Sequence, residues 1–401
     1  MHDDIRRAPR ATIGLAAGGT GGHLFPAEAL ARELQARGHG VVIYTEARGA
    51  RFTQALEGLP HLVLPARSLA GGIGGKLAAA AVILRATATA RGDMKRRGVR
   101  LLAGFGGYPS FAPALAARSL GLPLLLHEQG SRLSLANRRL LGFADRVATS
   151  FGDIGGVDAA AQGKLVETGN PVRADILTAA SAPYPPLADD APLRLLVVGG
   201  SQGAAVFGRV VPPALLALPE ALRKRLQVSL QYRGDDADAI GATLRDAGIR
   251  VDLRPFFDDM AAQLGDAHLV VTRAGATTIA DLLVVGRPAI LVPIPQGGSR
   301  DEQRGNALAL ERMGAGWCMR EDDGGFTAEA LAARLQDLFA EAGARADARP
   351  GHGAAAYQDG LRLAEAAAAA TRLGRPDAAA RLADEVEALL AARAPIGNAE
   401  G

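Results

Sequence analysis

Each half of the chain opens with the same succession of a strand, a glycine-rich turn and a helix. The first copy reads TIGLAAGGTGGHLFPAEALARELQARG, from Thr12 to Gly38, and the second reads LRLLVVGGSQGAAVFGRVV, from Leu193 to Val211. A strand that runs directly into a helix is typical of βαβ units, which build parallel sheets covered by helices. The repetition therefore predicts an α/β fold of two Rossmann-like domains in tandem, and 401 residues accommodate both.

The rest of the chain continues this alternation. Short apolar runs separate segments with a helical pattern, and such runs are typical of strands buried on both faces of a parallel sheet. The predicted strands are TIGLAAGG, VVIYT, LLAGFGG, PLLLHE and RVATS in the first half, and LRLLVVGG, VSLQY, VDLRP, LVVTR and AILVPIP in the second. The segment after the first turn ends at Gly38, which is a good helix stop.

The domain boundary is predicted from composition. The stretch SAPYPPLADDAP holds four prolines within twelve residues, which is typical of a linker. We therefore expect an N-terminal domain over 1–172, a linker over 173–192 and a C-terminal domain over 193–365. The alanine-rich segment 366–401 is predicted to be a helical tail that docks on the protein.

Composition and charge narrow the function. The single cysteine, Cys318, suits a reducing compartment, and neither a signal peptide nor a membrane-spanning apolar run is predicted. Residues 1–170 hold 21 Lys and Arg against 12 Asp and Glu, a net charge of +9, whereas the remainder is net −6. This asymmetry favours an anionic partner for the first half. Nucleic acid is not expected, because aromatic residues do not alternate with the basic ones.

The glycine-rich turns predict anion binding. N–H groups at the start of a helix favour phosphate, and glycine lets the ligand approach the backbone. The sequence lacks the third glycine of GxGxxG and has no GxxxxGK[ST], so a nicotinamide site and a P-loop are disfavoured. A tight turn without a ligand is the plainer alternative. His23 follows the first turn and could act as a base or bind a phosphate.

Further polar groups follow other predicted strands. These are the segments 104–110, 127–129, 168–173 and 272–278, followed by Asp281. The carboxyl ends of parallel strands meet at one edge of a sheet, where open α/β folds bind ligands. No pattern of metal ligands is present, and we expect neither a metal nor a cofactor.

These motifs, in this order, resemble the MurG family of peptidoglycan N-acetylglucosaminyltransferases. The resemblance rests on GGTGGHLFPAEALA, GFGGYPSFAP, LLLHEQ, TGNPVR, VVGGSQGA, FFDDMA, TRAGATTIADLL and DEQRGNA, and it covers about Thr12 to Ala392. It implies the GT-B fold and an inverting transfer of GlcNAc from UDP-GlcNAc to the C4 hydroxyl of the muramoyl sugar of lipid I, which gives lipid II. It also implies a peripheral position on the cytoplasmic face of the bacterial inner membrane.

The resemblance implies a role for individual residues. His23 would be the base or a diphosphate ligand, and Glu128 or a carboxylate brought over by domain closure is the alternative base. The residues expected to bind UDP-GlcNAc are Thr20, Gly21, Gly22, Gly130, Arg173, Ser201, Ala276, Thr277, Thr278, Asp281 and Gln303.

Three positions depart from the family pattern. Gly130 stands where many members have Asn, Asp281 where many have Glu, and Glu302 where some have Gln. None of these changes removes a group that catalysis obviously requires, so we expect them to affect affinity more than activity.

Residues 73–100 combine an apolar stripe with a cationic border. Val82, Ile83 and Leu84 lie among basic residues, namely Lys76, Arg85, Arg91, Lys95, Arg96, Arg97 and Arg100. This pattern fits contact with an anionic membrane surface, and an ordinary amphipathic helix is the alternative. Cell-wall synthesis proteins are candidate partners that the sequence does not identify. The rival functions are another GT-B enzyme that uses UDP-GlcNAc, such as a 2-epimerase or a soluble-acceptor transferase, and a non-catalytic cell-wall scaffold.

Overall fold

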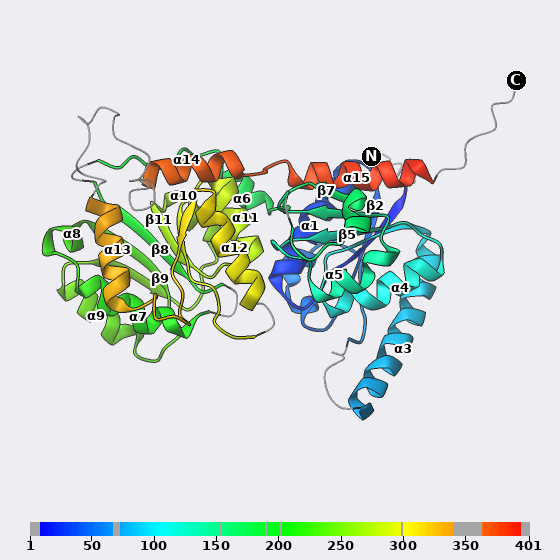
Figure 1. The fold of residues 1–401 in the computed structure, drawn as a ribbon, viewed down its shortest axis with the longest axis horizontal. Helices are drawn as coiled ribbons and strands as arrows, with labels where there is room; N and C mark the ends of the chain where they lie inside the picture. The colour runs from blue at the N-terminus through cyan, green and yellow to red at the C-terminus, as the bar shows by residue number, and fades with distance from the viewer. Residues whose placement is uncertain are drawn as a thin grey trace, which may run out of the picture. The chain divides into compact units, whose positions relative to one another are not determined.

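The chain forms two compact units (Figure 1). The structure is a computed structural model, and it describes residues 9–66, 73–152, 154–188, 191–200, 203–297, 300–340 and 363–393. Unit 1 comprises residues 1–173 and 375–401, and unit 2 comprises residues 174–374. The chain therefore passes between the units twice, after Arg173 and after Gly374.

Unit 1 is built on a parallel sheet in the order β3-β2-β1-β4-β5-β6-β7. Its strands are β1 (Thr12–Ala16), β2 (Gly40–Thr45), β3 (His61–Val63), β4 (Val99–Gly104), β5 (Leu124–Glu128), β6 (Arg146–Thr149) and β7 (Leu165–Glu167). In the register of the sheet, Ala16 at the end of β1 pairs with Gly104 at the end of β4. The turns that follow these two strands therefore leave the sheet side by side.

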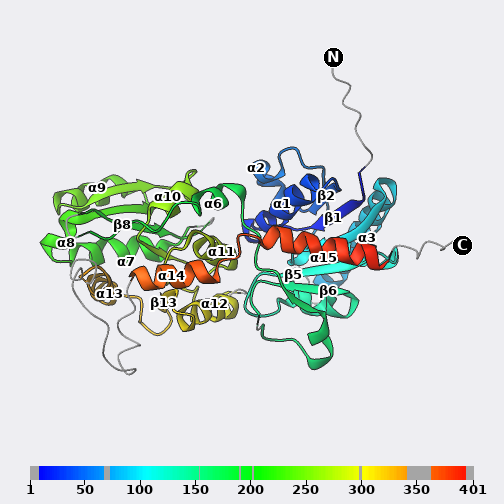
Figure 2. The same ribbon diagram turned by 90° about the horizontal axis from the view of Figure 1, so that it is seen from above.

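Helices cover both faces of this sheet. They are α1 (Gly21–Ala36), α2 (Thr53–Leu56), α3 (Ile73–Arg97), α4 (Phe111–Ser119), α5 (Leu135–Leu140) and α15 (Ala378–Ala392). The buried side chains form two clusters, one with α1 and α15 and one with α3 and α4. Figure 2 shows α15, in red, lying across unit 1. Helix α15, near the C-terminus, therefore completes the core of the N-terminal domain.

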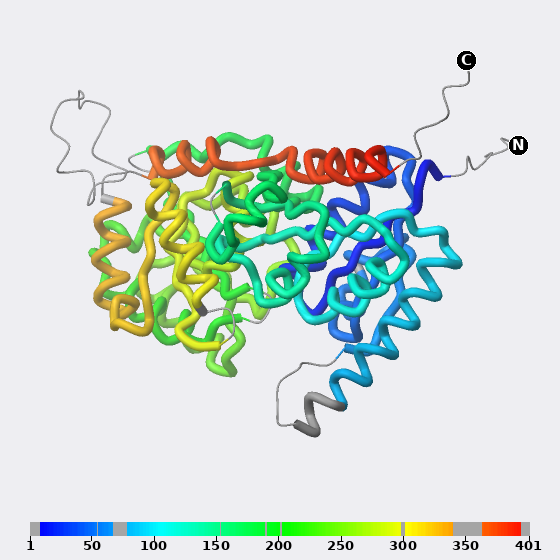
Figure 3. The backbone as a smooth tube through the Cα atoms, turned by 45° about the vertical axis from the view of Figure 1, so that its right-hand side comes forward, coloured from blue at the N-terminus to red at the C-terminus, as the bar shows by residue number. Residues whose placement is uncertain are grey.

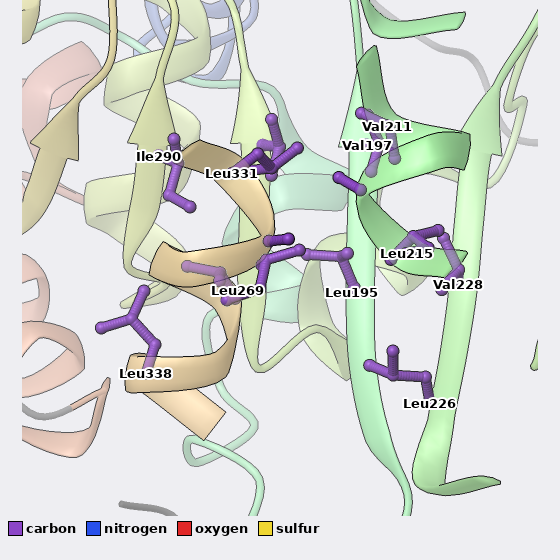
Figure 4. Close-up of a cluster of buried hydrophobic side chains, with 14 of the residues drawn as sticks. Leu195, Val197, Val211, Leu215, Leu226, Val228, Leu269, Ile290, Leu331 and Leu338 are labelled. Carbon is purple, nitrogen blue, oxygen red and sulfur yellow. The ribbon is translucent and has the colours of Figure 1, made fainter. Parts of the chain in front are cut away.

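Unit 2 repeats the architecture, with strands in the order β10-β9-β8-β11-β12-β13. The strands are β8 (Leu193–Val198), β9 (Leu226–Gln231), β10 (Arg250–Arg254), β11 (Leu269–Thr272), β12 (Ala289–Leu291) and β13 (Gly316–Cys318). The helices are α6 (Ala174–Ala179), α7 (Ala205–Leu216), α8 (Glu220–Arg225), α9 (Ala237–Asp246), α10 (Met260–Asp266), α11 (Ala276–Val285), α12 (Arg300–Arg312), α13 (Ala328–Ala340) and α14 (Leu363–Leu373). Figure 4 shows how side chains from these strands interlock with those of α7 and α13.

The fold confirms the predicted α/β class with two parallel sheets. All ten predicted strands are present, and α1 ends at Ala36 just before Gly38, whose φ is +85°. The sequence analysis did not predict β3, β7 and β13, which have three residues each and lie at the edges of their sheets.

The structure divides the chain at other residues than the composition indicated. The segment expected to begin the linker forms α6, which packs against α10 and α11 of unit 2. The predicted tail is split, because α14 packs on α11 of unit 2 whereas α15 packs on α1 of unit 1. In the described ranges, no helix is both long and apolar enough to cross a bilayer.

Candidate active site

His23 lies in the first turn of α1, beside the turn that follows β4. Its Nδ1 shares a 3.0 Å hydrogen bond with Oγ1 of Thr20, the N-cap residue of α1. A methyl group on Gly106 would lie 3.6 Å from His23 Nε2, and one on Gly107 would lie 3.8 Å from it. Burial lowers the pKa of His23 to about 4, so the ring is neutral near pH 7. A neutral imidazole held on one nitrogen can accept a proton on the other.

Glu128 is the last residue of β5 and is buried. Its carboxylate accepts hydrogen bonds from the backbone N–H of Ser134 at 2.7 Å, the side chain of Asn137 at 2.9 Å and the N–H of Gly130 at 3.3 Å. Burial raises the pKa of Glu128, while these hydrogen bonds act in the opposite direction. The carboxylate therefore organises the turn between β5 and α5.

Asn137 connects Glu128 to the neighbourhood of His23. Its side-chain N–H₂ also donates to His127 O at 3.0 Å, and its Nδ2 would lie 3.7 Å from a methyl group on Gly106. A side chain at position 106 would therefore meet both the His23 ring and the Asn137 amide. Asn137 Oδ1 is buried and has no hydrogen-bond partner among the described residues.

His127 precedes Glu128 in β5. It is fully buried, its Nε2 lies 3.1 Å from Gly169 O, and burial lowers its pKa to about 4. His127 Nδ1 and both polar side-chain atoms of the buried Asn170 have no hydrogen-bond partner in the described part of the chain. The edge of this sheet therefore holds several polar groups in neutral form.

The other predicted residues of unit 1 gather at the same edge. Gly21 and Gly22 begin α1, and Gly130 is buried beside Glu128. Arg173 is the last residue before the chain enters unit 2, and its guanidinium lies 4.7 Å from the centroid of the Phe25 ring. In this unit the structure brings Thr20, His23 and Arg173 to the start of α1.

The predicted donor residues of unit 2 lie at the start of α11 and in α12. Ala276, Thr277 and Thr278 form the first turn of α11 after its N-cap Gly275, and Asp281 follows one turn later. Gln303 lies in α12, and its Oε1 accepts a hydrogen bond from the N–H of Ile294 at 3.2 Å. Ser201 lies outside the described residues.

Arg273 ties together the turns that surround this helix start. Its guanidinium donates to Val292 O at 3.1 Å and forms a close ion pair with Glu321. It also lies 5.4 Å from the ring centroid of Phe207 in α7. One side chain thus fixes the turns after β11, β12 and β13 against α7.

Two buried amides do the same for neighbouring turns. Asn306 in α12 donates to Ala274 O at 3.1 Å. Gln231, at the end of β9, accepts from Gly199 N at 2.9 Å and donates to Pro255 O at 3.3 Å. The amide of Gln231 therefore joins the turns after β8 and β10.

The sequence analysis missed Asn137, Asn306 and Gln231. Asn137 lies on a helix, away from the strand ends that drew attention, and a single amide there has no motif of its own. Asn306 was part of the quoted DEQRGNA motif but received no role. Arg273 was part of the quoted TRAGA motif but received no role. A charged residue directly after a buried strand is the signal that could have identified it.

The architecture and the site define a class of enzyme. The description "Glycosyltransferase family 28 N-terminal domain" matches residues 13–149, and "Glycosyltransferase family 28 C-terminal domain" matches residues 194–360. The two models fall on units 1 and 2, respectively, and each includes the glycine-rich turn of its unit. The protein is a glycosyltransferase with two Rossmann-like domains.

Full-length relatives narrow this class. The chain is 44% identical over 376 residues to the UDP-N-acetylglucosamine–N-acetylmuramyl-(pentapeptide) pyrophosphoryl-undecaprenol N-acetylglucosamine transferase of Rhodospirillum centenum, covering 94% of each chain. It is 42% identical to the enzyme of the same name from Granulibacter bethesdensis, covering 100% of this chain and 99% of that one. The crystal structure of Acinetobacter baumannii MurG matches with a TM-score of 0.72 and 28% identity, over 94% of this chain and 99% of the other. The chain belongs to the MurG family of N-acetylglucosamine transferases.

Proposed function

We propose that this enzyme transfers GlcNAc from UDP-GlcNAc to the C4 hydroxyl of the muramoyl sugar of lipid I, with inversion at the anomeric carbon, and so makes lipid II. The full-length identity to relatives that carry this activity in their names supports the substrates. The single observation that carries the mechanism is the neutral His23 at the start of α1, whose Nδ1 is hydrogen-bonded to Thr20 while Nε2 has no hydrogen bond from the described residues.

His23 acts as the general base in this proposal. We assign the tautomer in which Nδ1–H donates the 3.0 Å hydrogen bond to Thr20 Oγ1, because this tautomer leaves the lone pair on Nε2. The acceptor hydroxyl loses its proton to Nε2 as its oxygen forms a bond to the anomeric carbon. The bond from that carbon to the diphosphate oxygen breaks, and UDP leaves with the electron pair.

Glu128 has a positioning role instead of a basic one. Its two carboxylate oxygens already accept three hydrogen bonds, and its side chain is buried. Glu128 holds Asn137, whose amide lies near Gly106, and the His23 ring also lies near Gly106. Gly130 contributes its backbone N–H to this network, so a side chain is not needed there.

Unit 2 binds the donor. N–H groups in the first turn of α11, from Ala276 to Thr278, and the dipole of this ten-residue helix favour an anion such as the diphosphate. Arg173 and Ser201 contribute to the same ligand, and Asp281 contacts the ribose. Because Gln303 Oε1 is already bonded to Ile294 N, its N–H₂ is the group that binds a GlcNAc hydroxyl.

The helix α3 provides the membrane contact. Figure 3 shows it running away from the rest of unit 1. Leu84 is 70% exposed and Arg85 is exposed, while Ala86, Ala90 and others pack inward. Arg96 and Arg97 pair with Asp93, so the cationic border is weaker at that end. Lys76 has a side chain outside the described residues. We place the enzyme on the cytoplasmic face of the inner membrane.

The test is transfer of labelled GlcNAc from UDP-GlcNAc to a lipid I analogue, with matched reactions that lack the acceptor. We expect UDP release that depends on the acceptor, together with a disaccharide–lipid product. UDP release or epimerised sugar without the acceptor would support an epimerase, and binding without turnover would support a scaffold. His23→Ala should abolish transfer, and His61→Ala, at an exposed histidine in β3, is the matched control.

A further inference from the structure

The ring of Phe25 lies under the guanidinium of Arg173. Phe25 belongs to the first two turns of α1, and Arg173 Cζ is 4.7 Å from its ring centroid. Phe52 supports the ring from another direction, with centroids 5.7 Å apart and planes at 81°. A guanidinium over an aromatic face is held by the ring quadrupole and by stacking.

The glycine-rich turn leaves room for this ring. A methyl group on Gly21 would lie 2.7 Å from Cε2 of Phe25, a distance that real Cβ contacts do not reach. Phe25 therefore folds back over the helix start, and a side chain at position 21 would make its ring shift. Gly21 thus makes room for the Phe25 ring of its own helix, in addition to letting a ligand approach the backbone as the motif suggested.

We infer that Phe25 is a positioning residue for Arg173 and sets the diphosphate-binding geometry of that arginine. This inference rests on the proposed function, in which Arg173 contacts the donor. An arginine has many rotamers, and an aromatic face that selects one of them lowers the cost of binding the ligand. The same helix start carries His23, whose ring lies against Gly106 instead. One turn of α1 therefore orients both the base and the arginine.

Binding of UDP, measured by titration calorimetry, tests this role without turnover. We expect Phe25→Leu to weaken binding about threefold to thirtyfold, as loss of a cation–π contact predicts. Phe25→Tyr keeps the aromatic face and should bind within about twofold of wild type. Phe52→Leu keeps the Phe25 ring and removes only the ring that supports it, so it should weaken UDP binding less than Phe25→Leu does.

Double variants separate positioning from packing. In an Arg173→Ala background, Phe25→Leu should cause no further loss of UDP affinity, because the arginine it orients is gone. Gly21→Ala should weaken binding as Phe25→Leu does, and should add nothing to Phe25→Leu, because the displaced ring is then absent. Unfolding midpoints of each variant show whether the fold is intact.

The outcomes are distinct. Effects of Phe25→Leu and Arg173→Ala that multiply, or a Phe25→Leu protein that binds UDP like wild type, would overturn the inference. A wild-type protein that binds UDP but transfers no GlcNAc to the lipid I analogue would overturn the proposed function, and the UDP titrations would still decide the role of Phe25. A wild-type protein that binds no UDP would overturn both.

Discussion

The carboxyl edges of the two sheets hold their polar groups in different ways. In unit 1 the titratable groups His23 and His127 are neutral, because burial lowers the pKa of each to about 4. In unit 2 the corresponding edge is held by the Arg273–Glu321 ion pair and by amides such as Gln231. The glycine-rich openings of the two halves are alike, but the groups placed around them are not.

This difference agrees with the roles that we propose for the two units. A neutral imidazole can take a proton, whereas fixed N–H groups and a paired arginine can hold the shape of an anion site without titrating. In the function we propose, unit 1 supplies the base His23 and one donor ligand, Arg173, whereas unit 2 supplies most of the donor contacts through the start of α11. Each prediction below tests one side of this division.

The largest effect is expected at the base. His23→Ala should lower the rate of GlcNAc transfer by about 10²–10⁴-fold, the usual worth of general-base catalysis. His23→Gln should lose as much, because an amide keeps polarity but has no basic nitrogen. Initial rates at saturating substrates measure this, and a loss under about tenfold would show that His23 is not the base.

The next effect is expected at the ion pair of unit 2. Arg273→Ala removes hydrogen bonds to two turns and takes from the partly buried Glu321 its ion-pair partner Arg273. We therefore expect a rise in the KM for UDP-GlcNAc and a loss of about 1–3 kcal/mol in unfolding free energy. Glu321→Gln should have a smaller effect of the same sign. The surface pair Arg320–Asp322 provides the control, and Arg320→Ala should leave the unfolding free energy nearly unchanged.

The effect of acid separates the two edges. Because the pKa of His127 is about 4 in the folded protein and about 6.5 in the unfolded chain, the unfolded chain binds the proton more tightly between these values. The contribution of neutral His127 to the unfolding free energy is complete above pH 6.5 and is lost as the pH falls toward 4. Between pH 6.5 and 4, the unfolding free energy of His127→Gln should therefore fall by up to about 3 kcal/mol less than that of wild type. Denaturant titrations at several pH values measure this, and parallel pH profiles would contradict it.

The smallest effect is expected at the membrane. Leu84→Asp should weaken binding to vesicles that contain anionic lipid by several-fold to about tenfold, because Leu84 is the most exposed large apolar side chain among the described residues of α3. Leu177→Asp, on an exposed position of α6, is the matched control. Equal losses of vesicle binding for both variants in a flotation assay would show that α3 does not provide the membrane contact.

Most of the fold could be predicted from the sequence, because its central strands are buried on both faces. Such strands read as continuous apolar runs, and each run that was predicted is a strand. The strands β3, β7 and β13 escaped because a three-residue edge strand has no such run, and β3 and β7 are also partly exposed. The division of the tail between the units depends on contacts such as Arg37 with Glu387, which are distant in sequence.

The site residues that could be predicted are those in sequence motifs at strand ends. Turn residues such as Thr20, His23 and Ala276 follow strands directly, so their shared location comes from the topology of parallel sheets. Asn137 and Phe25 were not recognised as functional, because their roles depend on which turn their helix faces. Burial also changed the interpretation of Glu128, since the sequence does not show that its carboxylate is already occupied.

Donor binding and transfer by the same His23→Ala protein test the division between the units most directly. The account predicts a dissociation constant for UDP-GlcNAc within about twofold of wild type, together with a loss of transfer to the lipid I analogue of about a hundredfold or more. Transfer that falls only in proportion to lost UDP-GlcNAc affinity would contradict it, because His23 would then act in donor binding and not as the base.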